Sequence, residues 1–215
     1  MKYILQRFCY VVKAFSLREY ANFFDNDEGQ QYNVHMNNQI VDAVSCSMRG
    51  FRLPRYNEIP NVGLYLEQTT KYVNQCIHPL GFEEVTSAMI RNYVKNGIIE
   101  KPVQKQYSAS QIAHLIALAL LKQVAPLEHV NELFSILHDS NRYTVPVAYD
   151  YFCDEMENIL YYRFGLKESI DRVGVTDSFE KEMLRSAVTA VSHIVYLNRC
   201  FSVRSEHMND RCIQE

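Results

Sequence analysis

Apolar residues recur at helical spacing from residue 61 into the C-terminal part of the chain. In the first such stretch they fall three or four residues apart, as on one face of a helix, at Val62, Tyr65, Leu66, Thr69, Tyr72, Val73, Cys76 and Ile77. This pattern predicts a helix that begins at Asn61. The helix should end at His78-Pro-Leu-Gly81, because proline and glycine interrupt helices.

A second, shorter helix is predicted over residues 86–96. Thr86 has a side chain suited to an N-cap, and Gly97 suits the residue just after a helix end. One face of this helix is apolar. The opposite face is polar and carries Ser87, Arg91, Asn92 and Lys95.

A short basic turn follows this helix. Lys101 and Lys105 lie within residues 100–107, and we expect a hairpin, or wing, over residues 101–106. Tyr107 closes the wing and is expected to anchor it to the core. A short polar-faced helix, a glycine stop, a basic hairpin and two core helices, in this order, are typical of a winged helix-turn-helix, a DNA-binding motif.

The remaining chain predicts four more helices. Ser108 and Gln111 have the spacing of a capping box, and Pro126 suits the first turn of the next helix. A longer helix is expected over residues 147–164, and another from Asp177 as its N-cap.

The first 35 residues fit this pattern less well. They include an acidic, polar stretch over residues 25–31, and a cleaner pattern begins at Met36. Two interpretations stay open: an extension appended to the folded protein, and an ordinary N-terminal helix over residues 1–20. Under the first, deleting residues 1–35 should leave thermal stability unchanged.

We therefore expect an all-α protein in four parts. Residues 1–60 would be a partly disordered extension and lead-in, and residues 61–140 a winged helix-turn-helix with a short β-wing. Residues 141–205 would form a C-terminal helical hairpin for dimerisation or sensing, and residues 206–215 a tail. The chain of 215 residues, 47% of them apolar, is long enough to bury a core of this kind.

Charge is distributed unevenly along the chain. The net charge is −3, which alone argues against a nucleic-acid partner. Residues 86–125, however, carry five basic side chains against Glu100 alone, a local charge of +4. Screening limits electrostatic attraction to about 8–10 Å, so an acidic remainder is compatible with a basic binding face.

The polar helix and the wing also carry a family resemblance. The residues concerned are Ile90, Arg91, Tyr93, Gly97 and Ile98, with Tyr107-Ser108 at the end of the wing. This arrangement resembles the DNA-binding domain of MerR-type regulators. The resemblance implies that Arg91 and Tyr93 contact DNA, mostly its backbone.

A broader resemblance spans residues 51–201. Its carriers are Leu53-Pro-Arg-Tyr, Asn61-Val-Gly-Leu-Tyr-Leu-Glu67, Ile90-Arg-Asn-Tyr-Val-Lys-Asn-Gly97, Lys105-Gln-Tyr-Ser108 and Tyr149-Asp-Tyr-Phe152. Here the chain is similar to an uncharacterised bacterial family, the domain of unknown function eighteen-thirty-six. The resemblance implies a helical body with a MerR-like head and no known reaction or ligand. It also implies that Met36 is close to the usual start of such proteins.

Few residues point to catalysis or metal binding. His114 and His193 lie near apolar stripes, where satisfied core histidines are commoner than ligands. Three acids, Asp154, Glu155 and Glu157, are expected on the solvated face of their helix. The sequence has no phosphate loop, nucleophile elbow or dinucleotide fingerprint. We expect no catalytic residue, no metal site and no cofactor.

Two further features bear on location. The six cysteines form no CxxC pair, which is typical of reduced thiols in a cytosolic protein. No stretch has the roughly 18 consecutive apolar residues of a membrane span. We expect a cytoplasmic protein with no membrane partner.

The leading hypothesis is a bacterial transcriptional regulator that binds double-stranded DNA and is not an enzyme. The expected contact residues are Ser87, Arg91, Asn92, Tyr93, Lys95, Lys101, Lys105 and Tyr107. The alternative is a helical adaptor that binds proteins, which an acidic residue against the basic face would favour. A small-molecule pocket among the tyrosines and phenylalanines of residues 143–164 is compatible with either, although the sequence identifies no effector.

A homodimer through the two C-terminal helices is also expected. The helix from Asp177 carries an apolar stripe nearly twenty residues long, made of Phe179, Met183, Ala187, Val191, Ile194 and Val195. The neighbouring helix is shorter and should cover only part of it. Helix-turn-helix proteins also commonly bind paired half-sites as dimers.

Overall fold

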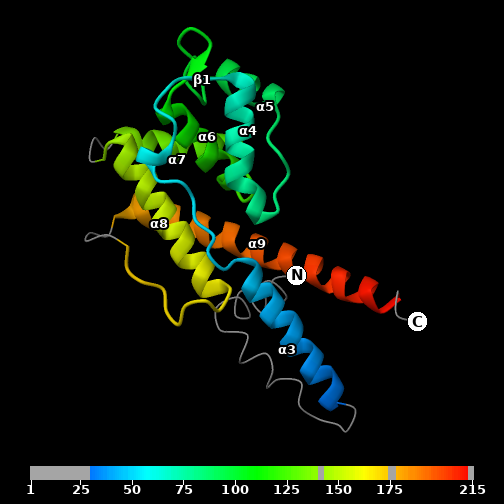
Figure 1. The fold of residues 1–215 in the computed structure, drawn as a ribbon. Helices are drawn as coiled ribbons and strands as arrows, with labels where there is room; N and C mark the ends of the chain where they lie inside the picture. Colours follow the sequence, from blue (N-terminus) through cyan, green and yellow to red (C-terminus); the bar gives the residue numbers. More distant parts are fainter. Residues whose placement is uncertain (1–29, 140–142, 174–177, 213–215) are drawn as a thin grey trace, which may run out of the picture.

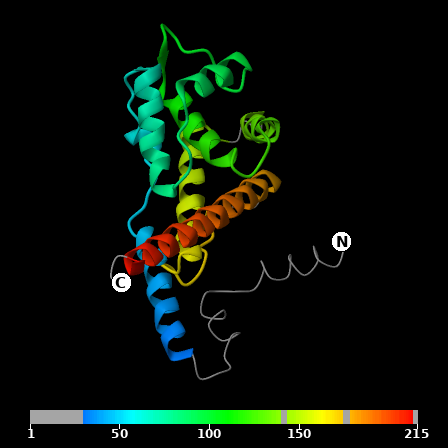
Figure 2. The same ribbon diagram turned by 90° about the vertical axis from the view of Figure 1, so that its right-hand side faces the viewer.

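The computed structural model describes residues 30–139, 143–173 and 178–212. This part is mostly helical, with seven α-helices and one two-stranded antiparallel sheet (Figure 1). A mostly helical protein is therefore confirmed. The helices α4 (Leu66–Ile77), α5 (Ser87–Lys95), α6 (Ala109–Leu121) and α7 (Leu127–Asp139), with the short sheet, form one end of the molecule, which we call the head (residues 61–139). Helix α9 lies between the head and α3 (Figure 2).

The described chain begins with α3 (Gln30–Ser47), which starts before Met36 and packs against α9. Near its C-terminal end, Val44 and Met48 are each 1% exposed, so α3 belongs to the core. The polar stretch of residues 25–31 lies outside the described residues except for its last two positions, which are in α3.

The helix predicted from Asn61 begins later, so this boundary was wrong. The single-turn helix η1 (Tyr56–Glu58) is followed by strand β1 (Leu64–Tyr65), and α4 spans Leu66–Ile77. Strand β1 pairs with β2 (Gln106–Tyr107), with Leu64 opposite Tyr107. This long-range pairing overrides the local helical pattern. Val62 and Tyr65, predicted on the buried face, are 68% and 55% exposed.

Helix α5 spans Ser87–Lys95, within one residue of the prediction. Its N-cap is Thr86, whose hydroxyl accepts a hydrogen bond of 3.2 Å from the Met89 amide. Gly97 follows the helix with a φ of 74°, which only glycine adopts at little cost. Between α4 and α5 the chain turns through η2 (His78–Leu80).

The second half of the chain consists of α6 (Ala109–Leu121), α7 (Leu127–Asp139), α8 (Val145–Arg163) and α9 (Phe179–Cys212). Ser108 and Gln111 form the predicted capping box at the start of α6. The predicted N-cap of α9, Asp177, lies outside the described residues. The Ser178 hydroxyl accepts a 3.4 Å hydrogen bond from the Lys181 amide.

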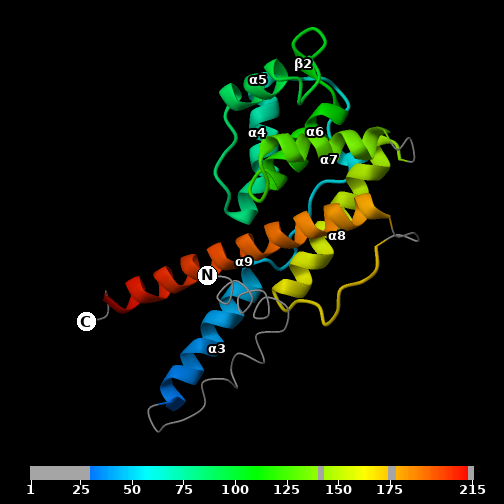
Figure 3. The same ribbon diagram turned by 180° about the vertical axis from the view of Figure 1, so that it is seen from behind.

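The central part of the apolar stripe of α9 is covered within one chain. Helices α8, α3, α7 and α6 all pack against α9 (Figure 3). Val188, Val191 and Val195 are fully buried as a result. The expectation that the stripe would be left partly uncovered holds at Phe179, which is 76% exposed, but α3 covers more of α9 than the sequence pattern indicated.

Candidate nucleic-acid interface

Helix α5 presents one face to the core and the other to solvent. Ile90 and Tyr93 are 0% and 6% exposed, whereas Arg91, Asn92 and Lys95 are exposed. The face assignment made from the sequence is confirmed. The polar face of α5 therefore consists of two cations and one amide that are accessible to a partner.

Helix α5 is held firmly on α4. The Asn74 side chain of α4 donates to the Val85 carbonyl at 2.9 Å and accepts from the Val85 amide at 2.8 Å. The hydroxyls of Thr70 and Ser87 lie 3.0 Å apart. These contacts fix the turn between the helices, so the polar face of α5 has a defined orientation.

The wing is a tight turn that returns to the body through β2. Val103 and Gln106 form a bridge, with a 2.9 Å hydrogen bond from the Gln106 amide to the Val103 carbonyl. The two central residues, Gln104 and Lys105, have positive φ values of 50° and 65°. Two successive positive φ values are characteristic of a type I′ hairpin turn. The exposed side chain of Lys105 is thereby placed at the tip of the wing.

Both ends of the wing are anchored in the head. Gln111 of α6 donates a 2.8 Å hydrogen bond to the Glu100 carbonyl, and Tyr107 is 3% exposed. Burial raises the pKa of Tyr107, and the nearby positive charge of Arg91 acts in the opposite direction. Arg91 of α5 is therefore close to β2, and both elements lie at the same end of the molecule (Figure 3).

The four basic side chains of α5 and the wing are exposed. Within the part of the chain that the structure describes, no ion pair involves Arg91, Lys95, Lys101 or Lys105. We call these four residues the basic face. Cations without a carboxylate partner remain available to anions such as phosphate groups.

One carboxylate lies beside the basic face. The Ser87 hydroxyl donates a 2.9 Å hydrogen bond to Glu67 of α4, at the N-terminal end of α5. This bond occupies Ser87, which was predicted to contact DNA.

The predicted contact residues thus fall into two groups. Five are exposed: Arg91, Asn92, Lys95, Lys101 and Lys105. Of the others, Ser87 is half-buried and bonded within the head, and Tyr93 and Tyr107 are buried. The two tyrosines chiefly hold α5 and the wing on the core.

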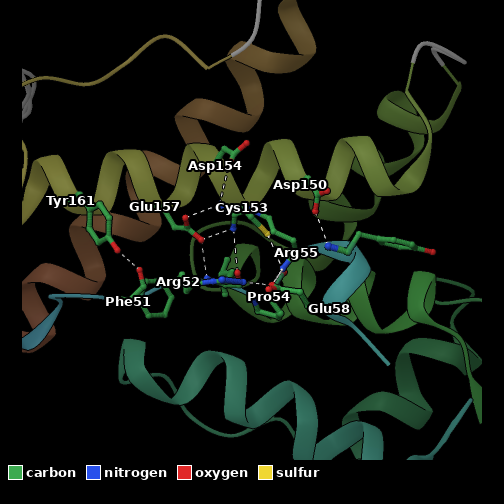
Figure 4. Close-up of polar contacts among 12 residues, drawn as sticks. Phe51, Arg52, Pro54, Arg55, Glu58, Asp150, Cys153, Asp154, Glu157 and Tyr161 are labelled. Carbon is green, nitrogen blue, oxygen red and sulfur yellow. Dashed lines mark hydrogen bonds and ion pairs between the residues drawn. The ribbon is translucent and has the colours of Figure 1, made fainter. Parts of the chain in front are cut away.

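A second polar cluster joins the lead-in segment, residues 51–58, to α8 (Figure 4). The Arg55 guanidinium binds both oxygens of Glu157, at 2.6 and 2.8 Å. The Nη2 atom of Arg55 also donates a 2.8 Å hydrogen bond to Asp154. Glu157 in addition accepts a 2.9 Å hydrogen bond from the Leu53 amide. We call this arrangement the Arg55 clamp.

Further contacts extend the clamp in both directions along α8. The Tyr56 amide donates a 2.7 Å hydrogen bond to Asp150, and the Tyr161 hydroxyl donates to the Phe51 carbonyl. The Tyr56 hydroxyl also lies 2.7 Å from the Ser110 hydroxyl of α6. The lead-in segment is therefore bonded to both α8 and α6.

The prediction of a solvated acidic face on α8 was wrong for two of three residues. Glu155 is fully buried and accepts hydrogen bonds from Arg185 and Tyr151, each at 2.7 Å. Glu157 is held in the clamp, and only Asp154 keeps a largely exposed carboxylate. Because arginines and backbone amides saturate the buried carboxylates, these acids stabilise the fold.

The described residues give no indication of a metal centre or a membrane span. They contain no group of three or more His, Cys, Asp or Glu side chains that could hold a metal ion. No helix among them is long and apolar enough to cross a membrane. His114 is half-buried and packs on Phe134, with ring centroids 5.1 Å apart.

Comparison with known proteins identifies one domain. Residues 54–152 match the family model described as Domain of unknown function (DUF1836). The match covers the end of the lead-in segment, the head and the first part of α8. It confirms that family resemblance over these residues. No curated protein and no solved structure matches the chain.

Proposed function

We propose that the head binds double-stranded DNA and that the protein is a cytoplasmic transcriptional regulator. The observation that carries the proposal is the basic face: four exposed cations, without ion-pair partners among the described residues, on α5 and the wing. Lysine and arginine neutralise phosphates and supply most of the affinity of such interfaces.

In the proposed complex, α5 enters the major groove and the wing lies against the backbone. Asn92 is exposed beside Arg91 and can bond to an adenine edge, the usual partner of asparagine. Gln104, exposed at the wing tip, is the second candidate for base contact. This mode follows the MerR-type resemblance of Ile90, Arg91 and Tyr93.

The second candidate function is a protein-binding adaptor. It is favoured by the Glu67 carboxylate, which bonds to Ser87 at the N-terminal end of α5. A carboxylate at this position repels the phosphates that helix N-termini otherwise attract. DNA binding remains the leading proposal because the four cations of the basic face outnumber the two carboxylates near it, Glu67 and the exposed Glu100.

The first experiment is selection from a pool of random DNA duplexes with the purified full-length protein. We expect enrichment of one motif and affinity that falls with salt. At a slope of about −0.9 per neutralised phosphate, the four cations of the basic face predict about −3 to −4 per head. Binding that ignores salt, together with an unenriched pool, would favour the adaptor.

The second experiment compares two arginine variants. Arg91→Ala should weaken DNA binding and reduce the salt slope by about 1. Arg204→Ala is the matched control, because Arg204 is exposed on α9 and is part of neither α5 nor the wing. Equal affinities for the two variants would remove α5 from the interface.

A homodimer remains part of the proposal, although other helices of the same chain cover the central part of the α9 stripe. Its basis is the two-fold symmetry of the operators that helix-turn-helix proteins commonly bind. Sedimentation velocity at micromolar concentrations, with and without the selected duplex, tests it. A monomer in both conditions would exclude dimeric binding.

A further inference from the structure

A cavity of about 70 Å³ lies where the head meets the C-terminal helices. Its walls come from α6, α7, α9 and the N-terminal part of α8. The lining residues are Ala113, His114, Ala117, Leu121, Phe134, Tyr143, Val145, Ala148, Tyr149, Phe152 and Leu184. Three of them, Tyr143, Tyr149 and Phe152, are in the segment from which a pocket was predicted.

Three alanines create the space. Ala113 and Ala117 are one turn apart on α6, and Ala148 faces them from α8. Most other buried positions of α6 are leucine or isoleucine, with Ala119 as a further buried alanine outside the cavity lining. Protein interiors are normally packed as densely as organic crystals. A cavity at this junction is therefore a departure from dense packing, and its space is available to a small molecule.

The walls determine which ligands fit. They are mostly aromatic and aliphatic, with side-chain polar atoms only on His114, Tyr143 and Tyr149, and no Asp, Glu, Lys or Arg is among the described residues that line the cavity. A charged ligand would lose its hydration here without gaining an ionic partner. Enclosed apolar cavities accept apolar atoms and molecules, and the mostly apolar lining of this partly open cavity favours ligands of the same chemistry.

We propose that this cavity is a binding site for a small uncharged apolar molecule, or for the apolar end of a larger one. Its volume is about half that of an engineered cavity that accepts benzene or xenon, which leaves room for about three or four carbon atoms. The ligand would touch the head through α6 and α7 and the C-terminal pair through α8 and α9. This inference stands on the cavity alone and is independent of DNA binding.

Xenon is a suitable probe because it is apolar and small. We expect methyl NMR signals of Leu121, Val145 and Leu184 to shift with xenon pressure and to saturate. Ala148→Leu fills the cavity and should abolish the response. Ala190→Leu makes the same change at an exposed site on α9 and should leave the response intact.

The outcomes separate a binding site from ordinary packing. Saturable shifts in the wild type and in Ala190→Leu, but not in Ala148→Leu, would support the proposal. Ala113→Val adds less volume and tests the same space if Ala148→Leu fails to fold. An unresponsive wild type, or equal responses in wild type and filled variants, would overturn it.

Discussion

Replacing Arg55 with alanine tests whether the Arg55 clamp stabilises the fold. The change removes two hydrogen bonds to Glu157 and one to Asp154. It leaves the Glu157 carboxylate, whose side chain is 14% exposed, with the Leu53 amide as a remaining donor. The expected loss is therefore due to a nearly buried charge that has lost its partner.

The size of the loss follows from the exposure of the pair. Breaking a buried ion pair by removing one member costs about 3–5 kcal/mol, and exposed pairs contribute far less. The Arg55 side chain is 28% exposed, so solvent partly compensates the loss. We expect the free energy of unfolding to fall by about 2–3 kcal/mol. For a protein of this size, that lowers the melting temperature by about 4–12 °C.

Arg52→Ala is the matched control in the same segment. Arg52 pairs with Glu58, but their side chains are 55% and 43% exposed. Exposed pairs contribute little to stability, so this variant should unfold like the wild type. Urea denaturation followed by circular dichroism, with thermal melts in parallel, measures both variants.

The result that would refute this reasoning is a wild-type free energy of unfolding for Arg55→Ala. The lead-in segment would then be held mainly by its apolar residues, such as Leu53, which is 0% exposed. A loss in Arg52→Ala as large as that in Arg55→Ala would likewise show that burial does not determine the contribution of these arginines.

Three further predictions concern the head and α9. Tyr93→Ala should lower the free energy of unfolding by about 3 kcal/mol, as large-to-small core changes do, whereas Arg91→Ala should leave the melting temperature unchanged. A destabilised Arg91→Ala beside a stable Tyr93→Ala would show that the buried and exposed faces of α5 are assigned the wrong way round. Gly63→Ala places a Cβ atom 2.7 Å from the Gln106 Cβ, so it should displace β2 and destabilise the head by about 1–3 kcal/mol. The variant should also bind DNA more weakly in anisotropy titrations, and wild-type stability would show that β2 can shift without loss of stability. Burial lowers the pKa of His193 below its ordinary 6.5, so the unfolded chain binds a proton at higher pH than the folded protein does, and the free energy of unfolding should decline as pH falls below 6.5. His193→Phe should reduce this decline in urea melts, and an unchanged pH dependence in the variant would contradict the prediction.

Local signals predicted the helices of the head well. The caps at Thr86 and Gly97 and the Ser108–Gln111 box act within four residues, so the sequence alone identifies them. The exposed face of α5 followed from the helical period for the same reason. These elements include most of the candidate interface.

Long-range partners explain what the sequence could not predict. Strand β1 replaced the first turn of a predicted helix because it pairs with Gln106 and Tyr107, far along the chain. Glu155 and Glu157 looked like solvated acids, yet their arginine partners are 30 and 102 residues away. The type I′ turn of the wing lacked the usual Asn-Gly signal, since Gln104 and Lys105 occupy its centre.

The clamp also determines how the head is attached to the rest of the protein. The Tyr56 amide and the Asp150 carboxylate, 94 residues apart, are joined by a 2.7 Å hydrogen bond, so the polypeptide enters and leaves the head at nearly one point. Domains whose ends lie together can be inserted into another fold or circularly permuted without disturbing it. The head is thus arranged like an insertion between α3 and the remainder of α8. Lengthening or shortening the wing would change the reach of the head while leaving the spacing of α3, α8 and α9 intact.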